Sequence, residues 1–247
     1  MLPWIDDLKG HAIFLDLGGT IAEIAEHPDD VCVRPATLRL LEALNDESNG
    51  ALAVISGREL SVIDRLLHPL KLPAAGVHGL ERRDAAGVLH AARTSEVRPI
   101  SFVFEKVLGD ETGVVIERKP GAVAVHYRLR PDLEQRCCEI VRQVVGQRAD
   151  LRLIHGKMVF EILQKGMDKG SVINAFLEEA PFQGRIPIFA GDDVTDEAGF
   201  AAVNSQGGIS IKVGAQETDA RFRANDVQEL ENWLRDLIAD GRGEQVH

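Results

Sequence analysis

Two acidic clusters far apart in the chain each follow a short apolar run. The segment 16–20 (DLGGT) follows the run 12–15, and the segment 191–197 (GDDVTDE) follows the run 186–190. Because the carboxyl ends of parallel strands lie at one sheet edge, where ligands usually bind, Asp16 and Asp192 are expected to meet there. Mg²⁺ prefers carboxylates, waters and phosphate oxygens, and a carboxylate beside such an ion stays ionised and can act as a nucleophile. The alternative is that each cluster only caps a helix, but two clusters that both end strands favour a metal site.

Two further polar residues stand where phosphate chemistry needs donors. Ser56 ends the apolar run 51–55, and Lys169 comes just before a predicted helix. A hydroxyl and an ammonium group at these places could neutralise charge on a phosphoryl group during its transfer. A lysine in such a position is, on its own, more often a solvated surface residue.

A third set of charged residues lies on two predicted hairpins in the middle of the chain. Glu117, Lys119 and Arg128 belong to the first hairpin. Lys157, Val159 and Glu161 are every second residue of the second hairpin, so Lys157 and Glu161 could share one face. Charged pairs on a hairpin usually form its wet face. They would hold sugar hydroxyls or a phosphate only if that face closes over the metal.

The elements that position these residues follow two different patterns. Apolar strands alternate with helix-period segments before residue 93 and after residue 167, which is typical of a parallel α/β sheet. Between residues 94 and 166 the order becomes helix, strand, strand, helix, strand, strand, with the second hairpin turning about Gly156. We expect a core of residues 1–93 and 167–247 interrupted by an α+β cap of residues 94–166. The strands expected in the core are 12–15, 51–55, 74–77, 186–190 and 209–213, and its helices are centred on 38–44, 59–67, 171–178 and 230–238.

Composition excludes several classes of protein. The 247 residues are 45% hydrophobic and 27% charged, with a net charge of −11, which excludes a disordered or collagen-like chain and disfavours nucleic acid and anionic membranes as partners. A small anionic substrate remains possible because a few cations or a metal ion set the field inside a cleft. Three cysteines at no metal-ligand spacing, and no apolar run of signal-peptide or membrane length, predict a cytoplasmic protein. The acidic surface and the lack of an apolar stripe slightly favour a monomer.

The order of these segments resembles a known family. Four of them match in order the motifs of the haloacid dehalogenase-like phosphatases, namely 16–20, 56–58 (SGR), 169–170 (KG) and 191–193. Others resemble the trehalose-6-phosphate phosphatases within that superfamily, namely 76–81 (GVHGLE), 117–119 (ERK), 126–128 (HYR) and 191–197. The resemblance spans about residues 12 to 214.

This resemblance implies a Rossmann-like core with a mobile α+β cap and Mg²⁺-dependent hydrolysis of trehalose 6-phosphate to trehalose and phosphate. It implies that Asp16 is the nucleophile that forms an aspartyl-phosphate, that Asp192 is a metal ligand supported by Asp193 and Asp196, and that Ser56 and Lys169 bind the phosphoryl group. The residues expected to recognise the sugar hydroxyls are Glu117, Lys119, Arg128, Lys157 and Glu161. Arg58 lies in a matched segment without an assigned role.

The sequence departs from the family at one position of the first motif. The family reads DxDGT there, and its second aspartate is the general acid that protonates the leaving sugar oxygen and then activates water, whereas this chain has Gly18. The backbone carbonyl of Gly18 can still face the metal, but glycine cannot transfer the proton. Since general acid–base catalysis contributes about 10²- to 10⁴-fold, we expect a chain that binds metal and substrate yet turns over slowly. The alternatives are a natural pseudoenzyme that binds a sugar phosphate, an introduced substitution at residue 18, or a phosphatase of another sugar phosphate.

Overall fold

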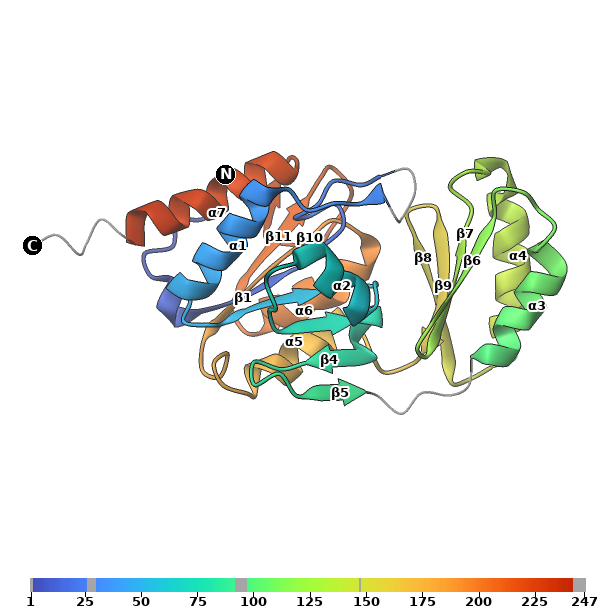
Figure 1. Ribbon diagram of the computed structural model, residues 1–247, viewed down its shortest axis with the longest axis horizontal. Coiled ribbons are helices and arrows are strands. Elements are labelled where there is room, and N and C mark those ends of the chain that lie inside the picture. The colour runs from blue at the N-terminus through green and yellow to red at the C-terminus, as the bar shows by residue number, and fades with distance from the viewer. Residues whose placement is uncertain (1, 26–29, 92–96, 147, 242–247) are drawn as a thin grey trace, which may run out of the picture. The chain divides into compact units, whose positions relative to one another are not determined.

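The computed structural model describes residues 2–25, 30–91, 97–146 and 148–241 (Figure 1). The chain divides into two compact units, residues 1–90 with 168–247 and residues 91–167, which we call the core and the cap. The predicted boundary between residues 93 and 94 lies outside the described residues. Within the described ranges, no helix is both long and apolar enough to cross a membrane.

The core contains one sheet whose strands are mostly parallel. Its order is β12-β11-β10-β1-β2-β3-β4-β5, and the neighbours from β12 to β3 pair in parallel, while β3 and β4 pair antiparallel. The predicted fold class, a parallel α/β core with an inserted α+β cap, is confirmed. The strands are β1 (His11–Leu15), β2 (Leu52–Ile55), β3 (Ala74–Gly76), β4 (Glu81–Arg83), β5 (Leu89–Ala91), β10 (Ile186–Gly191), β11 (Ile209–Val213) and β12 (Phe222–Ala224).

Helices cover both faces of this sheet because its central strands are apolar on both sides. In β1, Ile13 and Leu15 pack with α1, α2 and α7, while Ala12 and Phe14 pack with α5 and α6 on the opposite face. The helices are α1 (Pro35–Glu47), α2 (Leu60–Leu67), α5 (Lys169–Leu177), α6 (Glu197–Ser205) and α7 (Val227–Gly241), with short 3₁₀ helices η1 (Leu8–Gly10), η3 (Val77–Gly79) and η5 (Val194–Asp196). Neither α6 nor β12 was among the expected elements.

The cap is an antiparallel sheet of order β6-β7-β9-β8 with two helices on one face, as Figure 1 shows. Alternate residues such as Val123, Val125, Phe160 and Ile162 form its apolar core with the helices. The residues between them point to the other face, where register places Glu117 beside Ala124 and Ala124 beside Glu161. Its elements are α3 (Arg98–Leu108), β6 (Val115–Lys119), β7 (Ala122–His126), η4 (Pro131–Leu133), α4 (Glu134–Val145), β8 (Leu151–Gly156) and β9 (Val159–Gln164). The second hairpin turns after Gly156, at Lys157 and Met158, rather than about Gly156 itself.

Candidate active site

Three carboxylates meet at the carboxyl ends of the two central strands. Asp16 directly follows β1 and Asp192 follows β10, and the register that pairs Leu15 with Ala190 brings both to the same level of the sheet. Asp196 reaches the same point from η5. Asp16, Asp192 and Asp196 are all buried, and each offers an oxygen that lies within 4.8 Å of those of the other two. The structure therefore brings together the two acidic clusters of the sequence.

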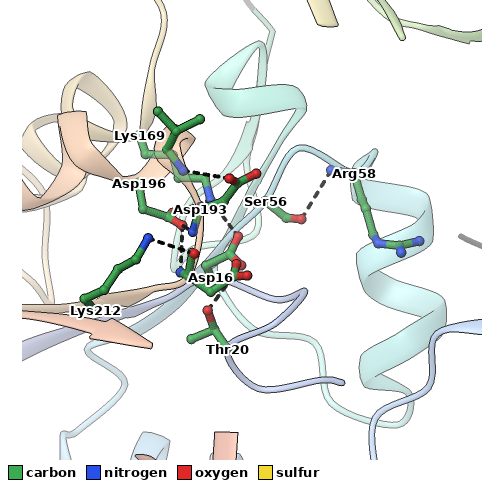
Figure 2. A network of polar contacts seen from close by, with 10 residues as sticks. Asp16, Thr20, Ser56, Arg58, Lys169, Asp193, Asp196 and Lys212 are labelled. Atoms are coloured by element: carbon green, nitrogen blue, oxygen red, sulfur yellow. Dashed lines mark hydrogen bonds and ion pairs between the residues drawn. The ribbon is translucent and has the colours of Figure 1, made fainter. Parts of the chain in front are cut away.

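Lys169 is a buried part of this cluster, so its interpretation as a solvated surface lysine is wrong. Its side chain is 2% exposed, and its Nζ donates to Asp16 Oδ1 at 2.6 Å and to Asp196 Oδ1 at 2.5 Å (Figure 2). The start of α5 is fixed by a capping box in which Asp168 and Ser171 bond each other's backbone N–H. This capping box fixes the backbone of Lys169, the first residue of α5, so that its side chain reaches both carboxylates.

Four further hydrogen bonds, which the sequence did not predict, hold the carboxylates and their loops. Lys212 of β11 is 1% exposed, and its Nζ donates to the backbone carbonyl of Asp192 at 2.8 Å. Asp196 Oδ2 accepts from the backbone N–H groups of Asp192 and Asp193, both at 2.9 Å. Thr20 Oγ1 donates to Asp16 Oδ2 at 3.3 Å. The sequence offered one signal for Lys212, because a lysine within the largely apolar run 209–213 indicates a buried charge with a specific partner.

The electrostatics of this cluster favour a cation. When all five groups are ionised, its three carboxylates and two ammonium groups leave one net negative charge inside the core. Burial, together with Asp196 and Asp192, raises the pKa of Asp16 to about 7 in spite of Lys169. Although burial opposes the charge of Lys169, Asp16 and Asp196 hold its pKa above the ordinary value. Burial lowers the pKa of Lys212. A positive ion beside Asp16 would therefore stabilise its ionised form.

Ser56, Arg58 and Asp193 take different places in this region. Ser56 follows β2, the strand on the other side of β1, and its buried Oγ accepts the Arg58 N–H at 3.2 Å. The guanidinium of Arg58 points away from Asp16 (Figure 2). Asp193 is the N-cap of η5, where its side chain accepts the Val194 N–H at 2.7 Å. Asp193 therefore shapes the loop, as a supporting residue would.

The two glycines after Asp16 differ in what they permit. Gly19 has a φ of +82°, and a Cβ there would lie 2.2 Å from Asp192 Oδ2. Gly18 lies outside the left-handed region, and a Cβ there would meet no atom within 4 Å. Residue 19 must therefore be glycine for this loop to form, whereas residue 18 has room for a side chain.

The cap carries a second buried charge cluster, so the interpretation of these pairs as a wet hairpin face is wrong for its central members. Lys119 Nζ lies 2.6 Å from Glu161 Oε1 and 3.5 Å from Glu117 Oε2, and the side chains of Lys119 and Glu161 are 5% and 10% exposed. His126 Nε2 lies 2.8 Å from Glu117 Oε2. Although burial opposes its charge, Glu161 and Glu117 hold the pKa of Lys119 above the ordinary value. His126 was missed, although it lies in the segment HYR.

Arg128 and Lys157 meet at the end of the same hairpins. The Arg128 guanidinium donates to the backbone carbonyl of Lys157 at 3.3 Å. Lys157 stands in the turn between β8 and β9, next to Met158 with its φ of +61°. The cap therefore places four of the five residues predicted for sugar recognition on two adjoining hairpins, with Lys119 in contact with both Glu117 and Glu161. Arg128, which was expected on the first hairpin, lies two residues beyond the end of β7.

Known proteins match most of the chain. Trehalose-6-phosphate phosphatase of Escherichia coli (strain K12) is 43% identical over 226 residues, which cover 91% of this chain and 85% of that protein. A probable trehalose-phosphate phosphatase of Sinorhizobium fredii is 42% identical over 210 residues, covering 84% and 79%.

Solved structures agree with this match. The C-terminal domain of C. albicans trehalose-6-phosphate phosphatase superposes with a TM-score of 0.85 at 20% identity and covers 94% of this chain and 92% of that chain. A trehalose-6-phosphate phosphatase related protein superposes with a TM-score of 0.76 at 29% identity, covering 94% and 99%. A haloacid dehalogenase-like hydrolase from B. subtilis shares the fold, with a TM-score of 0.66 at 14% identity over 92% of this chain and 99% of that chain. The sequence profile of the trehalose-phosphatase family matches residues 14–228, so the resemblance is confirmed and the chain belongs to that family.

Proposed function

We propose that the chain is a Mg²⁺-dependent phosphatase that hydrolyses trehalose 6-phosphate through an aspartyl-phosphate on Asp16, and that Gly18 slows this reaction. The observation that carries the proposal is the buried set of Asp16, Asp192 and Asp196 tied by Lys169 at the sheet edge of a trehalose-phosphatase chain. Such a set combines a carboxylate nucleophile with a site for a hard cation.

The residues present fit Mg²⁺. Carboxylate oxygens are the ligands this ion prefers, and the cluster presents three of them with one net negative charge remaining. Asp16 and Asp192, with the backbone carbonyl of Gly18, would hold the ion, and Asp196 would hold the loop. When bound, Mg²⁺ supplies positive charge for the phosphate oxygens and keeps Asp16 ionised at neutral pH.

The chain's own residues then carry the transfer. A carboxylate oxygen of Asp16 attacks phosphorus, the bond from phosphorus to the sugar oxygen breaks, and an aspartyl-phosphate is formed. Lys169 and Ser56 donate to the phosphoryl oxygens, while Thr20 and Lys169 fix the Asp16 carboxylate. A water then attacks the phosphorus, releases phosphate and restores Asp16.

Gly18 is the point at which this sequence of steps is impaired. The sugar oxygen must take up a proton when it leaves, and the attacking water must lose one. Gly18 has no group for either transfer, so both protons must exchange with solvent. Position 18 should therefore limit turnover and leave binding of metal and phosphate intact.

The cap supplies the sugar specificity in this proposal. Glu117 and Glu161 accept hydrogen bonds from sugar hydroxyls, and Lys119, Arg128 and Lys157 donate to them. Lys119, held between the two carboxylates, keeps their oxygens at fixed positions. We place the reaction in the biosynthesis of trehalose. We propose that it takes place in the cytoplasm, in keeping with the three free thiols. We also propose that the protein is a monomer with no nucleic-acid or membrane partner.

Gly18 also favours a second candidate function, a sensor that binds a sugar phosphate without hydrolysing it. Phosphate release from trehalose 6-phosphate with Mg²⁺, measured beside calorimetric binding, separates the two. Slow release supports the impaired enzyme, and tight binding without release supports the sensor. Preference for a monosaccharide phosphate in a substrate panel would contradict the proposed substrate.

A further inference from the structure

The turn from Gly76 to Glu81, which joins β3 to β4, has an unusual backbone. Val77, His78 and Gly79 have φ values of +48°, +53° and +104° in succession. A β-branched residue rarely adopts this conformation, and such positions persist only where their surroundings fix them. This turn contacts the loop from Ser56 to Leu60. We call residues 76–81 the buttress turn and residues 56–60 the serine loop.

Main-chain hydrogen bonds join the two segments. The Val77 N–H donates to the Arg58 carbonyl at 2.9 Å, and the His78 N–H donates to the Ser56 carbonyl at 3.0 Å. The left-handed backbone turns these two successive N–H groups toward the serine loop. A Cβ on Gly76 would lie 2.7 Å from the Arg58 carbonyl oxygen, so this glycine permits the close approach.

Two side chains of the buttress turn complete the contact. His78 is buried, and its ring packs against Gly57. A Cβ on Gly57 would lie only 2.7 Å from His78 Nε2, so glycine leaves the room that the ring needs. Glu81 Oε2 accepts the Leu60 N–H at 3.1 Å, which satisfies one donor at the start of α2. The serine loop is thus held by the buttress turn at its beginning, middle and end.

We propose that the buttress turn holds the serine loop in the shape that presents the Ser56 hydroxyl to a phosphoryl group, with His78 and Glu81 as positioning residues. This inference rests on the proposed function, which assigns Ser56 to the phosphoryl group. In this proposal neither side chain contacts substrate. Each acts by fixing the backbone from which Ser56 projects, and a small displacement of such a donor lowers affinity strongly.

The test combines hydrogen exchange with phosphate binding on the full chain. The variants are Glu81→Ala, which removes the acceptor, Glu81→Gln, which keeps an oxygen at that place, and His78→Asn, because Asn removes the ring yet tolerates a left-handed backbone. We expect Glu81→Ala and His78→Asn to speed amide exchange within residues 57–60 and to weaken binding of inorganic phosphate with Mg²⁺ by about 10-fold. Glu81→Gln should restore most of both, and His90→Asn on the nearby strand β5 serves as the control.

The outcomes separate the inference from the function on which it rests. Unchanged exchange and unchanged phosphate affinity in Glu81→Ala and His78→Asn would overturn the inference. The double variant Glu81→Ala with Ser56→Ala should bind phosphate no more weakly than Ser56→Ala alone. A further loss of about 10-fold in the double variant would also overturn the inference. If the parent chain binds no phosphate, the proposed function fails, and the exchange rates still decide whether the buttress turn fixes the serine loop.

Discussion

Replacing Gly18 with Asp should convert a slow chain into a fast phosphatase. The backbone at residue 18 is not left-handed, and a Cβ there meets no atom within 4 Å, so the new side chain fits without displacing its neighbours. A general acid and base at this position contributes about 10²- to 10⁴-fold, which corresponds to roughly 3 to 5 kcal/mol of the barrier. We expect kcat for trehalose 6-phosphate with Mg²⁺ to rise within that range.

The same change affects the stability of the fold in two opposite ways. Replacing a glycine at a compatible backbone position stabilises the fold by about 0.4 to 1 kcal/mol. A further carboxylate near Asp16, Asp192 and Asp196 adds repulsion, which Mg²⁺ relieves. Gly18→Asp should therefore depend more strongly on Mg²⁺ for thermal stability than the parent chain does.

Two control variants make the kinetic result specific. Gly18→Asn has nearly the same shape without an acid and should remain slow. Gly10→Asp adds a carboxylate at another open glycine, in η1, and should leave the rate unchanged. Phosphate release measured on the four chains decides the matter. A Gly18→Asp chain no faster than the parent, or a Gly18→Asn chain as fast as Gly18→Asp, would refute the proton-transfer argument.

Four further predictions follow from the two charge clusters and from the buried carboxylate of Glu231. In the Gly18→Asp background, Asp16→Asn should abolish phosphate release while circular dichroism stays unchanged, and retention of the rate would exclude Asp16 as nucleophile. Mg²⁺ at a concentration 100 times its dissociation constant should stabilise the chain by about 2.7 kcal/mol, which corresponds to a rise in Tm of about 5 to 10 °C. Asp192→Asn should lose most of this rise in a thermal melt. Glu161→Ala should weaken trehalose binding in calorimetry more than Mg²⁺ binding, and equal losses would contradict its role in sugar recognition. Burial alone would raise the pKa of Glu231, but hydrogen bonds from Thr37 and Arg34 hold it below the ordinary 4.5. This carboxylate therefore stabilises the fold above about pH 4.5 and loses that effect as pH falls through the lowered pKa. Glu231→Gln should cost about 1 to 3 kcal/mol in urea unfolding at pH 7, and this difference should shrink as the pH is lowered through that pKa.

The meeting of the two acidic clusters could be predicted from the sequence because parallel strands end at one edge. Asp16 and Asp192 each stand directly after an apolar run, and the register of β1 and β10 brings them level. What the sequence could not show is which of the later acidic residues faces inward. That depends on η5, where Asp193 caps the turn and Asp196 reaches back to the cluster.

Other parts of the molecule depend on tertiary contacts that no local pattern carries. The segment of α6 contains Gly199, which disfavours a helix, yet a Cβ there would lie 2.4 Å from the Phe189 ring, so close packing on β10 requires the glycine. Strand β12 has only three residues and exists by pairing with β11. The burial of Lys169 and Lys119 likewise follows from partners distant in the chain.

The core is assembled from two stretches of chain, and this sets the order in which the protein can form during synthesis. The cap is one continuous stretch, residues 91–167, so all of its strands can pair as soon as it has left the ribosome. Strand β1 is made early but lies between β2 and β10, and Asp16 must wait for Lys169, Asp192 and Asp196. Such long-range pairing is slow to form. The cluster of Asp16, Lys169, Asp192 and Asp196 is therefore among the last parts of the chain to assemble, and a nascent chain that stops within the cap has Asp16, the proposed nucleophile, without the residues that hold it.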